Sequence, residues 1–66
     1  MSKITRLVNN CISEMIATGN YKPIYDKYIG IVKDYSRIRV ITSDEAIETE
    51  RKLWKIYCEM IEAVGF

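Results

Sequence analysis

Apolar side chains recur at the spacing of an α-helix over the first part of the chain. They occupy positions i, i+3, i+4, i+7, i+8, i+11 and i+12, and they are Ile4, Leu7, Val8, Cys11, Ile12, Met15 and Ile16. This spacing places them on one face of a helix, with polar side chains opposite. Ser2 offers a side-chain cap before the first turn, and Gly19 offers the left-handed residue that commonly ends a helix. The pattern therefore predicts an α-helix over residues 3–18.

Helical spacing resumes in the middle of the chain, after a turn at residues 19–22. Pro23 suits the first turn of a helix because its φ is fixed near the helical value. Residues 28–32 would also fit a strand by propensity, but the length of the pattern favours a helix over residues 23–36. The apolar positions of this helix are Ile24, Tyr28, Ile31, Val32 and Tyr35.

Charged and apolar residues alternate over residues 37–41, directly after the second predicted helix. A period of two is typical of a half-buried extended segment. A single short strand has no partner within this chain. We therefore expect an extended link, either as an ordered linker or as a strand that pairs with its copy in a dimer.

A capping box marks the start of the third predicted helix, with Thr42 as the N-cap and Glu45 three residues later. The helix is expected to span residues 43–64 and to stop at Gly65. Its charged residues form one narrow stripe, and apolar residues cover nearly all of the remaining circumference. So broad an apolar arc needs more cover than two neighbouring helices supply, which predicts an interface between copies of the chain. The expected interface residues are Leu53, Trp54, Tyr57 and Ile61.

These segments together predict an all-α fold: one three-helix domain over residues 1–66, with a short extended link between the second and third helices. A chain of this size buries only about 60% of the surface that its unfolded form exposes. Without disulfides or metal, such a scaffold needs extra burial, so we expect a homo-oligomer. Residues 1–43 hold seven basic and three acidic side chains, and residues 44–66 hold three basic and six acidic ones. This asymmetry suits antiparallel self-assembly as well as docking within one chain.

The residue inventory argues against an enzyme. The chain has no histidine, which removes the commonest general base and metal ligand. Its three glycines are isolated, so no phosphate-cradling loop is formed. Its carboxylates show no metal-ligand spacing. We expect no catalytic residue, no metal and no cofactor.

The composition also bears on partners and compartment. A net charge of +1 implies no strong sequence-independent attraction to nucleic acid or anionic lipid, and no apolar run is long enough to span a membrane. Cys11 and Cys58 are expected to be buried thiols in a reducing cytoplasm, and no signal-peptide pattern precedes the first helix. Ile, Lys, Tyr and Asn make up 25 of the 66 residues. Their A/T-rich codons suggest an AT-rich bacterium, phage or mobile element.

Four tyrosines fall within fifteen residues and are interleaved with basic side chains. Tyrosine is enriched at binding surfaces, and it can stack on bases beside cations that contact phosphate. Three interpretations stay open: packing in the core, a protein-binding surface, or contact with a nucleotide or single-stranded nucleic acid. The candidate binding residues are Tyr21, Lys22, Tyr25, Tyr28, Arg37 and Arg39.

We expect a small non-enzymatic protein-binding module, an inhibitor or adaptor that self-associates and covers a larger protein partner. The alternative is a protein that binds or sequesters a nucleotide or single-stranded nucleic acid through the segment rich in tyrosine, lysine and arginine. For Trp54, packing in the core and anchoring the oligomer are both open.

Overall fold

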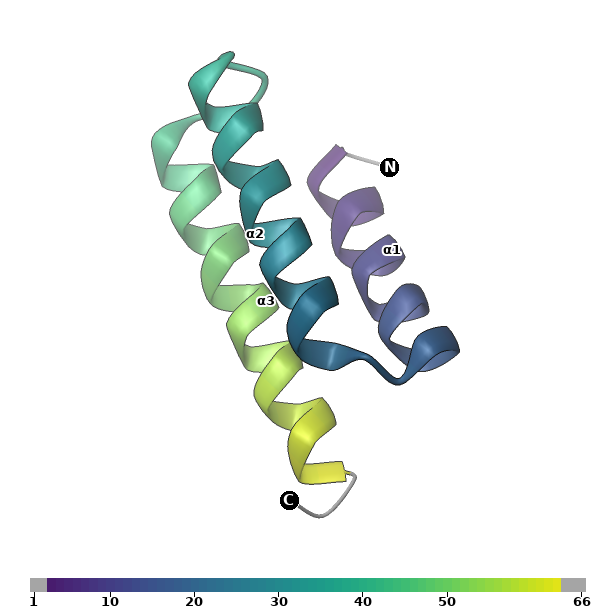
Figure 1. Ribbon diagram of the computed structural model, residues 1–66. Helices are drawn as coiled ribbons and strands as arrows, with labels where there is room; N and C mark the ends of the chain where they lie inside the picture. The colour runs from purple at the N-terminus through teal and green to yellow at the C-terminus, as the bar shows by residue number, and fades with distance from the viewer. Residues whose placement is uncertain (1–2, 64–66) are drawn as a thin grey trace.

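The computed structural model of the chain describes residues 3–63, which form three α-helices. They are α1 (Lys3–Thr18), α2 (Tyr21–Arg37) and α3 (Ser43–Ala63), and helices that are consecutive in sequence run antiparallel (Figure 1). No residue of this described range lies in a strand. The all-α, three-helix prediction is thus confirmed. The predicted cap at Ser2, the predicted end of the third helix at residue 64 and its stop at Gly65 lie outside the described residues.

Gly19 turns the chain between α1 and α2. Its φ is +70°, a left-handed conformation that glycine adopts without steric cost, and its N–H donates to the Met15 carbonyl over 2.9 Å. α2 then begins at Tyr21, two residues before the predicted start at Pro23. The first N–H groups of a helix have no partner within it, so Pro23 fits the first turn without losing a hydrogen bond.

The extended link predicted over residues 37–41 is not found, because the chain turns compactly at the end of α2. The Arg39 N–H donates to the Ser36 carbonyl over 3.1 Å, and the Val40 N–H donates to the Tyr35 carbonyl over 2.8 Å. This pair of bonds is the Schellman arrangement, which requires a left-handed residue, and Arg39 supplies it with a φ of 62°. The carbonyls at the end of α2 would otherwise lack hydrogen-bond partners. Because they accept these bonds, the link is held against the end of α2.

The start of α3 confirms the predicted capping box. The Glu45 N–H donates to the Thr42 hydroxyl oxygen over 3.1 Å, and the Thr42 N–H donates to the Glu45 carboxylate over 2.9 Å. One turn later, the buried Thr49 hydroxyl donates to the Glu45 carbonyl over 2.6 Å. The Thr42 and Glu45 N–H groups and the Thr49 hydroxyl are therefore satisfied locally.

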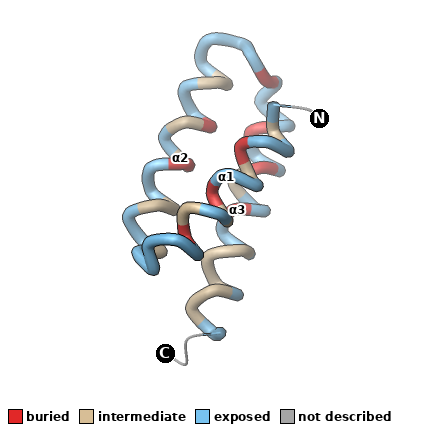
Figure 2. Tube along the Cα trace, turned by 90° about the vertical axis from the view of Figure 1, so that its right-hand side faces the viewer, coloured by how far each residue is buried: buried red, intermediate tan, exposed pale blue. Residues whose placement is uncertain are grey.

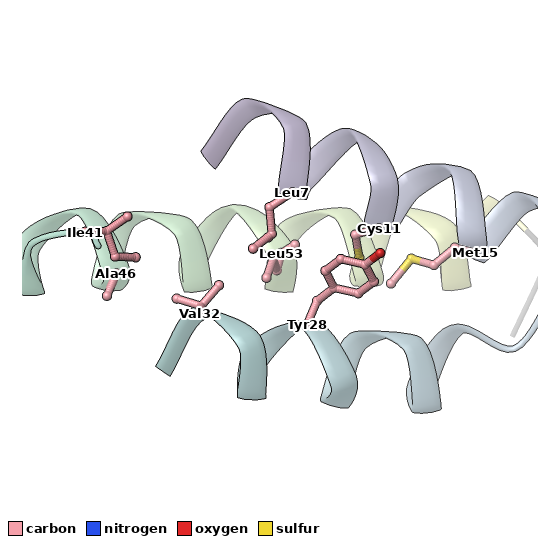
Figure 3. Packing of buried hydrophobic residues seen from close by; sticks show 8 residues of the cluster. All are labelled: Leu7, Cys11, Met15, Tyr28, Val32, Ile41, Ala46 and Leu53. Carbon is pink, nitrogen blue, oxygen red and sulfur yellow. The ribbon is translucent and has the colours of Figure 1, made fainter. Parts of the chain in front are cut away.

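All three helices and the link after α2 contribute to one small core (Figure 3). α2 and α3 share the most extensive contact, and α1 packs against both. Both cysteines are free thiols: Cys11 is fully buried, as predicted, and Cys58 is half-buried. The buried apolar residues are Leu7, Cys11, Met15, Tyr28, Val32, Ile41, Ala46 and Leu53.

The core does not extend along the whole of α3. Leu53 is the last buried residue of this helix, and the last turns of α3 reach past the α1–α2 turn (Figure 1). Figure 2 shows only intermediate and exposed residues there. Residues 54–63 therefore present side chains that the fold leaves partly uncovered.

Candidate binding surface

An aromatic cluster joins α2 to the C-terminal half of α3. The Tyr25 ring stacks on the Tyr57 ring, with centroids 5.0 Å apart and planes inclined by 20°. The Trp54 indole meets both rings, with its centroid 5.7 Å from that of Tyr25 and 5.6 Å from that of Tyr57. Trp54 and Tyr57 are three residues apart and so are neighbours on one face of α3. We call these three residues the aromatic cluster.

Trp54 is the most exposed member of the cluster. Its exposed fraction is 54%, while Tyr25 and Tyr57 are half-buried. Tryptophan and tyrosine bury large areas when they meet a partner, and they are enriched at the energetic centres of protein interfaces. The cluster therefore has the composition of a contact site for another protein surface.

An apolar groove of about 490 Å³ continues from the aromatic cluster toward the end of the molecule. It lies between the α1–α2 turn and the last turns of α3, and Tyr57 belongs to both the groove and the cluster. We call the cluster and this groove together the aromatic surface. The groove is lined by Gly19, Tyr21, Lys22, Pro23, Tyr57 and Ile61.

Charges at the aromatic surface are nearly balanced. The Lys22 ammonium forms an ion pair with Asp26 at 3.2 Å and lies 6.0 Å from the centroid of the Tyr25 ring. Burial of the Tyr25 phenol raises its pKa, and the carboxylates of Asp26 and Glu50 raise this pKa further. The surface therefore suits an apolar contact better than it suits a phosphate, which needs uncompensated cations.

The structure brings residues from two separately predicted sites onto this one surface. One set belongs to the segment predicted to bind a partner, and the other belongs to the predicted oligomer interface. About thirty residues of sequence separate the two sets, and the antiparallel packing of α2 and α3 unites them. The members are Tyr21, Lys22 and Tyr25 from the first set and Trp54, Tyr57 and Ile61 from the second.

Two of the predicted site residues belong to the core instead. Tyr28 is buried, and its hydroxyl donates to the Glu14 carboxylate, which also bonds Lys27 over 2.9 Å. Burial, with a further effect of the Glu14 carboxylate, raises the pKa of Tyr28 to about 12. Leu53 is 0% exposed. Leu53 offers no surface to a partner, and Tyr28 keeps an exposed fraction of only 7%, because the helices around them already cover most of their surface.

The two predicted arginines lie at the other end of α2. Arg37 is sixteen residues after Tyr21, which corresponds to about 24 Å along the helix. Its guanidinium pairs with Asp34 at 2.8 Å. Arg39 lies in the turn that follows and lines a separate cavity of about 360 Å³ together with Glu45. These arginines therefore do not share a site with the aromatic surface.

Sequence reasoning missed a second groove, between α1 and α2. It measures about 360 Å³, and we call it the basic groove. Lys3, Arg6 and Asn10 have the spacing i, i+3 and i+7, which places them along one side of α1. That spacing is visible in the sequence, but the residues opposite them are not. The lining residues are Lys3, Arg6, Leu7, Asn10, Tyr28, Ile31, Tyr35 and Val40.

Acidic and cysteine side chains are scattered over residues 3–63, and no group of three or more is placed to hold a metal ion. Within the same range, none of the helices combines the length and the apolar character that crossing a lipid bilayer requires. A comparison with protein-family models, curated proteins and solved structures finds no match for this chain.

Proposed function

We propose that this chain is a small protein-binding module without catalytic activity, and that the aromatic surface is its recognition site. The observation that carries this proposal is the exposed Trp54 indole. The indole is held in place by the stacked rings of Tyr25 and Tyr57, not by burial in the core. Rings that are already held in position lose little conformational freedom when they bind. The ion pair of Lys22 with Asp26 lets a partner approach without burying an unpaired charge.

We propose a second copy of the chain as the first occupant of this surface. A two-fold pair buries the same patch on both copies, so one apolar patch is enough to form the interface. The core of each copy is small and ends at Leu53, so burial of residues 54–63 in a pair would add to it. A larger protein partner would use the same surface. Self-association and partner binding then compete. Such competition suits an inhibitor or adaptor that stays self-associated until its partner binds.

The alternative function, nucleotide or single-strand binding through the segment of tyrosines and basic residues, has less support. Tyr21 and Arg37 lie about 24 Å apart along α2, too far for one mononucleotide to contact both. The ammonium of Lys22 is already paired with Asp26. We therefore do not place a nucleotide across Tyr21, Lys22 and Arg37.

Light scattering over a range of protein concentrations tests self-association. We expect the wild-type mass to rise from 7.7 kDa toward twice that value, and the Trp54→Ala variant to stay at 7.7 kDa with its helical circular dichroism retained. Ile16→Ala is the matched control, because Ile16 is also a large exposed apolar residue, at 69% exposure, but lies outside the aromatic surface. The proposal is wrong if the wild type remains a monomer at high micromolar concentration. It is equally wrong if Ile16→Ala dissociates the assembly as Trp54→Ala does.

A further inference from the structure

The basic groove plays no part in the proposed protein-binding surface. It lies between the N-terminal half of α1 and the C-terminal half of α2, near the other end of α2 from Tyr21. Its volume is about 360 Å³. Small-molecule sites in proteins begin at about 300 Å³. The groove therefore has the size of a site for one small ligand.

Its lining combines positive charge with an apolar wall. Lys3 and Arg6 are exposed cations three residues apart on α1, and Leu7, Ile31 and Val40 supply the apolar wall. None of the described residues that line the groove is acidic. A lining of this kind favours a ligand that has a negative charge at one end and an apolar body at the other.

Acidic residues near the basic groove form ion pairs with cations that do not line it. Glu14, one turn beyond the groove on α1, bonds Lys27 at 2.9 Å. Asp34, on α2, bonds Arg37 at 2.8 Å. In the part of the chain that the structure describes, the two groove cations take part in no such ion pair. Their charge is therefore available to a ligand.

We propose that the basic groove binds a small phosphate monoester that carries an aromatic ring, such as a nucleoside monophosphate. A phosphate monoester has between one and two negative charges at neutral pH, which matches the two cations. The Arg6 guanidinium can bond two phosphate oxygens, and Lys3 adds a point charge. The ring of the ligand lies against the half-buried Tyr35 and the apolar wall, as bases stack on aromatic side chains. The Asn10 amide is placed to bond its polar edge.

An NMR titration of the isotope-labelled chain with adenosine monophosphate tests this site, with adenosine and inorganic phosphate as separate probes. We expect adenosine monophosphate to shift the amide signals of the groove residues. We also expect it to bind about tenfold or more tightly than either fragment, because each fragment makes only part of the contacts. Equal affinity for inorganic phosphate and adenosine monophosphate would show that the ring is not bound and would overturn the proposal.

Two double variants, each of which removes two positive charges, distinguish binding in the basic groove from a general attraction between the chain and an anionic ligand. Lys3→Gln with Arg6→Gln should weaken the binding of adenosine monophosphate by about tenfold or more. Lys33→Gln with Lys52→Gln, at exposed positions outside the groove, should change it by less than about twofold. Similar losses in both double variants would mean that only net charge matters and would overturn the proposal. Trp54→Ala should leave this binding unchanged, so a failure of self-association is distinguishable from a failure of the groove.

Discussion

Arg39 holds a conformation that side chains with a Cβ seldom adopt. Its φ of 62° costs about 1 kcal/mol relative to glycine. Two backbone hydrogen bonds at the end of α2 keep the residue there, because both depend on the left-handed turn. The structure therefore contains a position where glycine should stabilise the protein.

Arg39→Gly should raise the free energy of unfolding by about 1 kcal/mol, which corresponds to a rise in Tm of about 4–8 °C for a domain of this size. Thermal and urea denaturation followed by circular dichroism measure the change. Arg37→Gly is the control, because Arg37 lies in the last helical turn and pairs with Asp34, so glycine should destabilise there. A loss of stability in Arg39→Gly would contradict the left-handed turn.

The Glu14 carboxyl on α1 makes the stability of the fold depend on pH. The hydrogen bond from Tyr28 lowers the pKa of the Glu14 carboxyl, and the bond from Lys27 lowers it further. A carboxyl with a lowered pKa in the folded state contributes stability that is complete above its unfolded pKa and is lost as the pH falls through its folded pKa.

We therefore expect the Glu14 contribution to wild-type stability to be complete above a pH of about 4.5 and to be lost as the pH falls below it, and Glu14→Gln to lose less stability over the same acidic interval. Urea denaturation at several pH values measures both slopes. Glu59→Gln, at an exposed position on α3, should keep the wild-type slope. If Glu14→Gln also keeps the wild-type slope, the contact with Tyr28 does not stabilise the fold.

At the scale of the element, two consecutive residues of α3 differ in burial. Leu53 is fully buried among the three helices, while Trp54 is 54% exposed. Successive residues on a helix point about 100° apart, so one side chain enters the core while the next leaves it. The interpretation of Trp54 as a core residue is therefore wrong, and that of Leu53 as an interface residue is excluded by its burial.

Leu53→Ala should cost about 2–5 kcal/mol of stability because it leaves a cavity in a small core. Trp54→Ala should cost only about 1 kcal/mol, since it removes ring contacts at a surface. Both values apply to urea denaturation at low micromolar concentration, where association contributes least. Equal losses in the two variants would contradict the burial difference.

At the scale of the whole molecule, the core is concentrated where the three helices overlap, and the end of α3 lies beyond it (Figures 1 and 2). The basic groove lies near the other end of α2 from Tyr21 and the apolar groove of the aromatic surface. The two proposed sites could therefore be occupied at the same time. The arrangement also predicts that stability varies along the chain.

Amide hydrogen exchange should show the strongest protection around Cys11, Val32 and Leu53, and weaker protection over residues 57–63, where α3 has no buried residue. If a pair forms through the aromatic surface, protection over residues 54–61 should rise with protein concentration while α1 stays unchanged. Uniform protection along α3 at low concentration would contradict the short core.

The sequence by itself determined the local structure of this protein. The helical spacing of residues 4–16, the stop at Gly19 and the capping box of Thr42 with Glu45 predicted three helices nearly to the residue. Each of these signals depends on neighbours within a few positions of the chain, so it can be identified without knowledge of the packing.

Only the tertiary structure decided which side chains form the candidate sites. Tyr25 and Tyr28 have similar surroundings in the sequence, yet one stacks at the surface and the other bonds Glu14 in the core. The alternation over residues 37–41 indicated an extended link, yet local hydrogen bonds to the carbonyls at the end of α2 hold those residues in a turn. The tyrosines differ for a reason that lies in the packing. A helical pattern specifies a face within a wide arc, and the helices that cover that face determine which residues are buried.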